Sequence, residues 1–166
     1  MNWLNSRFTM SLALLLPLSV TAVAAPLPGK APTCDAVGKA IAAAYGPVAS
    51  VEDNTAAVNR LGAQVPYTVL RACRVHMPGT KVPLSITFDA PLNRQFLEGM
   101  AQFAGQHGSP AKKLTGPGYG DLAYLTPQIG GGTAINALVG QVVVTITAWT
   151  SAQDTENIAE HIIKLM

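Results

Sequence analysis

Hydrophobic residues recur at three- and four-residue spacing in three stretches of the chain, which is the pattern of a helix with one buried face. Thr33 can cap the first helix, Asp89 the second, and Ser151 the third, where Asp154 completes an S-x-x-D capping box. The three apolar stripes are Cys34, Val37, Ile41, Ala44 and Tyr45; Leu92, Phe96, Met100 and Phe103; and Ile158, Ile162 and Leu165. We expect all three stripes to face the core.

Alternation of apolar and polar residues predicts strands in the segments between these helices. Residues 82–89 have this pattern, and residues 67–77 have the β-branched and aromatic content of a strand, with Val69, Cys73, Val75 and Met77 on one face. We expect a further strand near residues 121–126. Residues 133–149 form a further pair, because Gly140-Gln141 suits a type II′ hairpin turn. For residues 48–66 the sequence allows two structures. One is a short helix that Asp53 caps and Gly62 ends, and the other is a loop.

This order of elements predicts an α+β fold, with an antiparallel sheet of about five strands and helices packed on one face. We expect a single domain over residues 34–166. If the helices cover one face only, the other face carries Val143 and Trp149, together with Tyr124 or Leu125. An apolar strip of that kind requires a ligand, a partner or a covering segment, so Tyr124, Val143 and Trp149 are the predicted binding surface.

The first residues have the composition of a secretory signal peptide, with Arg7, an apolar run over 10–18 and small residues at Ala22 and Ala24. We expect cleavage after Ala24, a flexible arm over residues 25–33, and a protein that is periplasmic or secreted. The apolar run is shorter than the roughly 20 residues that span a bilayer. No stable membrane anchor is therefore expected after cleavage.

Charge excludes one class of partner. Of eleven Lys and Arg residues, Arg7 leaves with the predicted leader, so ten remain against nine Asp and Glu. Lys112-Lys113 is the sole adjacent cationic pair, which is too little for a nucleic-acid-binding surface.

Cys34 and Cys73 are the two cysteines of the chain, and both follow the predicted cleavage site. In an oxidising compartment the simplest interpretation is one disulfide between them. The alternative, a reactive thiol or a metal-binding pair, lacks the C-x-x-C spacing and the neighbouring histidine that such sites use.

The stretch GPGYGDLAYL, residues 116–125, combines several glycines with an acid. A phosphate-binding loop leads from a strand into a helix, whereas this segment leads into a predicted strand. We interpret Gly118, Gly120 and Asp121 as a structural turn whose carboxylate accepts backbone N–H bonds. Calcium is the weaker alternative, because one acid cannot supply the six to eight oxygens that the ion takes.

No catalytic or metal-binding signature is found among the remaining polar residues. His76, His107 and His161 show no H-E-x-x-H or H-x-H spacing, and the chain has no G-x-S-x-G or S-x-x-K motif. We therefore expect a protein that is not an enzyme and holds no cofactor or metal. A hydrolase assembled from His76, Asp121 and a serine is retained as a further alternative.

The order of these features resembles a broad class of small secreted or lipid-anchored bacterial modules. This class includes actinobacterial lipoproteins and the extracellular sensor domains of some serine/threonine kinases. The matching features are Cys34 at the first helix, Cys73 within ACRVH, the turn GYGDLAY, the segment LVGQVVVTI and a closing helix. The chain differs from the lipoproteins in having no lipid-modifiable cysteine at the cleavage site. The resemblance implies a disulfide-stapled α+β domain with a cleft between helices and sheet.

These observations together predict an exported, non-enzymatic binding module in the cell envelope. Its partner would be a small amphipathic or apolar molecule. The alternative is an inhibitor or immunity factor that binds an envelope protein. A flat exposed patch around Trp149 would favour the inhibitor, and an enclosed cavity would favour the small molecule.

Overall fold

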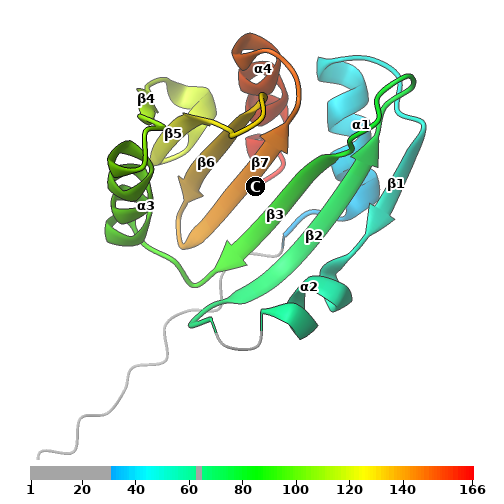
Figure 1. Ribbon diagram of the computed structural model, residues 1–166. Helices are drawn as coiled ribbons and strands as arrows, with labels where there is room; N and C mark the ends of the chain where they lie inside the picture. Colours follow the sequence, from blue (N-terminus) through cyan, green and yellow to red (C-terminus); the bar gives the residue numbers. More distant parts are fainter. Residues whose placement is uncertain (1–30, 63–64) are drawn as a thin grey trace, which may run out of the picture.

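The computed structural model describes residues 31–62 and 65–166. The predicted signal peptide, 1–24, and the predicted arm up to residue 30 lie outside the described residues. The described chain folds into one antiparallel sheet flanked by helices (Figure 1). Its elements are α1 (Cys34–Ala44), β1 (Ser50–Asp53), α2 (Thr55–Leu61), β2 (Thr68–His76), β3 (Leu84–Ala90), α3 (Arg94–Gln106), β4 (Lys112–Leu114), the 3₁₀ turn η1 (Pro117–Tyr119), β5 (Leu122–Pro127), β6 (Thr133–Val139), β7 (Val142–Ala148) and α4 (Ala152–Ile163).

The sheet has seven strands in the order β1-β2-β3-β7-β6-β5-β4, two more than the roughly five expected. The two additional strands are β1 and β4, which form the two edges of the sheet. They have four and three residues, so each is too short to show a clear alternation of apolar and polar positions. The mixed α and β content and the antiparallel pairing are as predicted.

Residues 48–66 contain both β1 and α2, and they complete the edge of β2. Strand β1 pairs with residues 73–76 of β2. Beyond that point, Thr55 Oγ1 accepts from the backbone nitrogen of Ala72 at 3.0 Å. The amide of Asn59 pairs with both backbone groups of Val69, at 3.1 and 2.8 Å. Side chains of α2 therefore take the hydrogen-bonding place of a strand along this half of β2.

The disulfide between Cys34 and Cys73 joins the start of α1 to β2, with Cα atoms 5.5 Å apart. Thr33 caps α1 by accepting a hydrogen bond from the nitrogen of Ala36 at 3.2 Å. In α4 the predicted capping box is also present, because Ser151 Oγ accepts from the nitrogen of Asp154. Local capping and the cysteine pair thus fix the two helices that lie on one side of the sheet.

A β-bulge changes the predicted face of one residue. The register between β2 and β3 shifts between Val69 and Arg71. As a result Val69 lies opposite Asp89, whereas Cys73 lies opposite Ile86 in the main core. An extra residue in one strand reverses the alternation of its faces, which periodicity alone does not reveal.

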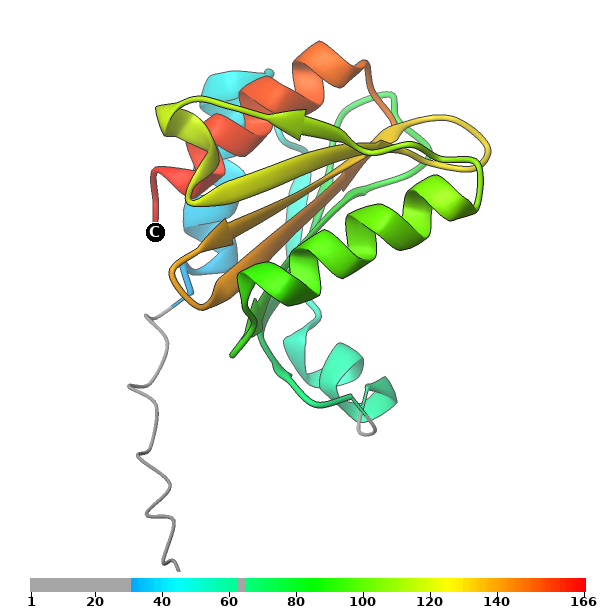
Figure 2. The same cartoon turned by 90° about the vertical axis from the view of Figure 1, so that its left-hand side faces the viewer.

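Helices cover both faces of the sheet rather than one, as Figure 2 shows. Helices α1 and α4 pack on one face of the sheet, which we call the α1/α4 face. The core beneath them is large and includes Ile86, Phe88, Ile135, Val144 and Ile146. Helix α3 contacts β5 and β6 on the opposite side, which we call the α3 face. The core on the α3 face is smaller and consists of Leu92, Leu97, Leu122, Leu138 and Val143. The expectation that all helices share one face is therefore wrong.

In the described part of the chain, no helix is long and apolar enough to cross a membrane.

Candidate ligand-binding site

Helix α3 begins later than the sequence pattern suggests. Asn93, not Asp89, caps it, by accepting a hydrogen bond from the nitrogen of Phe96 at 2.9 Å. Asp89 instead lies within β3, between Val69 of β2 and Val143 of β7. Both Asp and Asn are favoured N-cap residues, so the sequence before the stripe offers Asp89 and Asn93. Asp89 cannot serve as the cap because it belongs to β3.

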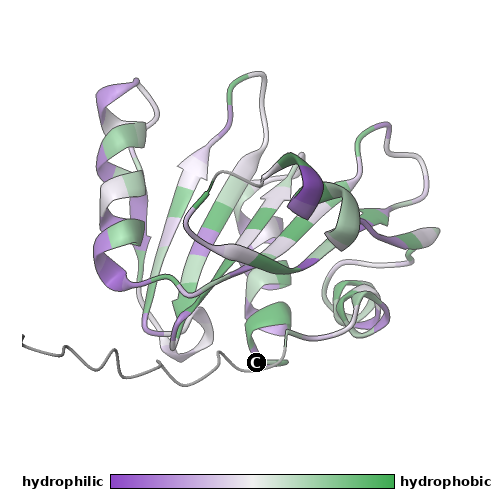
Figure 3. Cartoon of the chain, turned by 90° about the horizontal axis from the view of Figure 1, so that it is seen from below, coloured by the Kyte–Doolittle hydropathy of each residue, from purple (hydrophilic) through white to green (hydrophobic). Residues whose placement is uncertain are grey.

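The stripe predicted to be core in α3 lies mainly at the surface. Leu97 alone is buried among the residues of α3, all of which the structure describes. Met100 is 38% exposed and Phe103 is 62% exposed, while Phe96 is half-buried. Figure 3 shows hydrophobic residues alternating with hydrophilic ones along α3, on the left of the view. A second set at the same spacing, Leu97, Ala101 and Ala104, is less exposed than Met100 and Phe103.

A cavity of 540 Å³ lies between α3 and the sheet. Its α3 side is formed chiefly by Phe96, Leu97, Met100, Ala101, Phe103 and Ala104. The short side chains of Ala101 and Ala104 explain the space, because they follow Leu97 where longer residues would fill the gap to the sheet. Met100 and Phe103, which line the gap, are partly in solvent, so the gap is a hollow that is open on one side.

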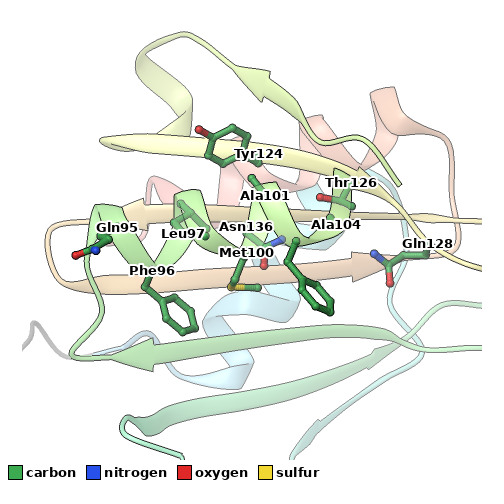
Figure 4. A pocket seen from close by; sticks show the side chains of 12 residues that line it. Gln95, Phe96, Leu97, Met100, Ala101, Ala104, Tyr124, Thr126, Gln128 and Asn136 are labelled. Carbon is green, nitrogen blue, oxygen red and sulfur yellow. The ribbon is translucent and has the colours of Figure 1, made fainter. Parts of the chain in front are cut away.

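The sheet side supplies most of the polar groups of the cavity (Figure 4). Tyr124, Thr126 and Asn136 lie on β5 and β6, Gln128 follows β5 at one end, and Gln95 of α3 is a further polar group. Asn136 is 8% exposed and Thr126 is 9% exposed. Oδ1 of Asn136 accepts a hydrogen bond from Thr145 Oγ1 at 2.9 Å, which fixes the amide and leaves Nδ2 as its donor. The cavity is thus largely apolar on its helix side, with a few polar groups on its sheet side.

The three residues of the predicted binding surface lie in three different environments. Tyr124 lines the cavity, whereas Val143 is 1% exposed and packs in the small core with Leu97. Leu125, the alternative to Tyr124, is buried on the α1/α4 face. Trp149 follows the end of β7, is 46% exposed and lines a separate hollow of 240 Å³ with Tyr45 and Val82. The α3 residues that line the cavity have the same helical spacing as residues of a core stripe. Periodicity therefore could not distinguish cavity-lining residues from core residues.

The glycine-rich stretch before β5 forms a turn that contacts the hairpin between β6 and β7. Gly120 has a φ of 68°, and a Cβ there would collide with the carbonyl oxygen of Leu138. Asp121 Oδ2 accepts a hydrogen bond from the nitrogen of Gly140 at 2.7 Å. At Gly118 a Cβ would press on the side chain of Glu160 in α4. These contacts join the turn to β6, the hairpin and α4.

The residues of the alternative hydrolase are not brought together. His76 ends β2 and Asp121 precedes β5, and three strands, β3, β7 and β6, lie between them. Strand spacing alone then puts them about 19 Å apart. His107 and His161 each contact a backbone carbonyl one helical turn earlier, of Phe103 and of Asn157. In the described chain no three His, Cys, Asp or Glu residues gather as a metal site would require.

One half-buried carboxyl group lies on the α3 face outside the cavity lining. Burial raises the pKa of Asp89, and the hydrogen bond from Thr87 Oγ1, at 2.9 Å, only partly offsets this effect. Its Oδ1 is buried and has no partner in the described residues. Asp89 therefore destabilises the fold when it is ionised.

The chain matches no family model, no curated protein and no solved structure. The resemblance to secreted lipoproteins and kinase sensor domains stays a prediction.

Proposed function

We propose that this protein is an exported, non-enzymatic binding module that holds a small apolar or amphipathic ligand between α3 and the sheet. The observation that carries the proposal is the 540 Å³ cavity. Sites for small molecules have volumes of roughly 300 to 1,000 Å³ and are mainly apolar, with a few polar groups that orient the ligand. The cavity matches this description in both size and chemistry.

The exposure of α3 supports the same function. A helix that places Met100 and Phe103 partly in solvent gives up hydrophobic stabilisation that a different orientation would provide. A ligand in the cavity would bury these side chains. The weakly anchored helix also gives a route for entry, because elements with few buried contacts open at low free-energy cost.

Export is the second part of the proposal. The disulfide between Cys34 and Cys73 is the type of bond that persists in oxidising compartments. The predicted signal peptide over residues 1–24 would direct the chain there. A ligand carrier of the cell envelope, in the periplasm or outside the cell, fits both features.

Filling the cavity tests the proposal. In the Ala104→Phe variant, the added ring would occupy the space between α3 and the sheet. We expect the wild type to bind the uncharged dye Nile red saturably, measured by its fluorescence, and the variant to lose this binding. Gln102→Phe is the matched control, because Gln102 lies on α3, is exposed and does not line the cavity. Unchanged dye binding in a folded Ala104→Phe variant would place the ligand elsewhere.

A second candidate function is binding of an envelope protein through the surface around Trp149. Trp149, Tyr45 and Val82 are each more than two-fifths exposed, and Ile129 is 93% exposed. Aromatic residues of this kind are enriched in protein interfaces. This surface shares no lining residue with the α3 cavity. Trp149→Ala would therefore abolish binding of a protein partner, measured by native mass spectrometry, and leave Nile red binding intact.

A further inference from the structure

The absence of charge among the cavity residues limits the ligand. In the described chain, the cavity lining contains no Asp, Glu, Lys, Arg or His. The charged residues of α3 that could approach, Arg94 and Glu98, lie 3.8 Å from one another, and both are exposed. Transfer of an ionised group into an apolar site without a partner is strongly unfavourable. A carboxylate or an ammonium group would therefore have to stay outside.

Asn136 determines which polar group is recognised. Its Oδ1 already accepts a hydrogen bond from the hydroxyl of Thr145, whereas Nδ2 forms no hydrogen bond with another residue of the described chain, so Nδ2 is the group with an open position for a ligand. Asn136 belongs to β6 in the middle of the sheet, with strand neighbours on both sides, which holds its backbone in place. A fixed donor beside an apolar wall selects a molecule that carries an acceptor oxygen.

The apolar part of the ligand is matched by the other wall of the cavity. The α3 residues that line it extend from Gln95 to Ala104, a length of about 14 Å at the 1.5 Å rise of a helix. Phe96 and Met100 project from the same side of α3 in Figure 4. Such a wall suits an elongated hydrocarbon more than a compact polar molecule.

Resting on the proposed function, we infer that the ligand is an uncharged, elongated apolar molecule with a carbonyl-type oxygen. The oxygen accepts a hydrogen bond from Nδ2 of Asn136, and the hydrocarbon lies along α3. This class includes neutral lipids with ester or ketone groups. Free fatty acids and cationic amphiphiles should bind more weakly, because their charged groups find no charged partner among the lining residues and have to stay in solvent.

Four probes of similar length test this specificity by displacement of Nile red from the full protein near neutral pH. They are methyl nonyl ketone, undecane, decanoate and decylammonium. We expect the ketone to bind about tenfold more tightly than undecane, which is the scale of one hydrogen bond. Decanoate and decylammonium should bind more weakly than the ketone by a larger factor.

The variant Asn136→Asp retains an acceptor for Thr145 but replaces the Nδ2 donor with a carboxylate oxygen. We expect it to bind the ketone at least about tenfold more weakly than the wild type does, and to lose the preference for ketone over undecane. Asn157→Asp makes the same change in α4, outside the cavity lining, and should bind all four probes as the wild type does.

The outcomes separate this inference from the function on which it rests. Tightest binding of decanoate or decylammonium by the wild type, or equal binding of ketone and undecane, would overturn the inference while the binding module stands. Wild-type protein that binds neither Nile red nor any probe would overturn both. The comparison among probes uses the wild type alone, so it remains decisive even if the Asn136→Asp variant fails to fold.

Discussion

The two faces of the sheet differ in how completely their helices are packed. The α1/α4 face carries a continuous core of 23 buried residues and the disulfide. The α3 face carries five, and only Leu97 belongs to α3 itself. Helices on both faces have apolar stripes of similar strength in the sequence. The difference shows that the α1/α4 face is closely packed, while the α3 face leaves a cavity, which we propose as the ligand site.

The largest expected effect is on the α1/α4 face. Replacing both cysteines, Cys34→Ala with Cys73→Ala, should lower the free energy of unfolding by about 4 kcal/mol in the chain-entropy model, because the disulfide closes a long loop. Urea unfolding under oxidising conditions measures the effect. Reduced wild-type protein is the control and should show a similar loss. Equal stability of the oxidised wild type and the variant would show that the bond does not stabilise the fold.

Two substitutions in α3 test whether this helix depends on one anchor. Leu97→Ala should cost about 3 kcal/mol of unfolding free energy, since Leu97 is fully buried. Met100→Ala should cost less than about 1 kcal/mol, because Met100 is partly in solvent. Urea unfolding compares the pair. Similar costs for both residues would mean that Met100 contributes to a core and that the two faces are more alike than we describe.

Substitution of Asp121 tests the turn that precedes β5 and contacts the hairpin between β6 and β7. Asp121→Ala removes the acceptor for the nitrogen of Gly140 and should cost about 1 to 2 kcal/mol of unfolding free energy. Asp121→Asn is the matched control, since its amide oxygen can still accept this bond, and it should cost less. Loss of Nile red binding in Asp121→Ala at unchanged stability would instead assign the turn to the binding site.

The smallest expected effect has the opposite sign and concerns Asp89 on the α3 face. Its folded-state pKa is raised by burial, so the folded protein holds its proton more tightly than the unfolded chain does. Stability therefore falls as pH rises from near the ordinary Asp pKa of 3.8 through the raised pKa of Asp89.

Asp89→Asn removes this loss. The variant should have a higher melting temperature than the wild type at neutral pH, with a difference that shrinks as the pH is lowered toward 3.8. Thermal unfolding at several pH values measures the difference. A variant less stable than the wild type at neutral pH would show that the ionised carboxylate is favourable in the fold.

Much of the fold follows from local patterns. The caps at Thr33 and Ser151, the hairpin at Gly140 and the pairing of the two cysteines can each be predicted from the sequence, and the structure contains all of them. The caps and the hairpin depend on residues that are close together in the chain. The disulfide could be predicted because the chain has two cysteines, which allow one pairing. Local hydrogen-bonding preferences and turn conformations act over a few residues, so they are visible in the sequence.

The cavity could not be predicted in the same way. Periodicity shows that α3 has an apolar side, but it does not show which residues of that side meet the sheet. Leu97 packs with Leu122, Leu138 and Val143, which come from three different strands. That choice places Ala101 and Ala104 over Asn136 and Thr126 and leaves the gap between them unfilled.

The sequence by itself thus determined the antiparallel α+β character, the disulfide and most of the element boundaries. Tertiary structure decided the short edge strands β1 and β4, the reversed face of Val69 after the bulge and the position of α3. The physical reason is that each of these depends on contacts between segments far apart in the chain. Local propensity acts before such contacts exist, and burial acts only when they form.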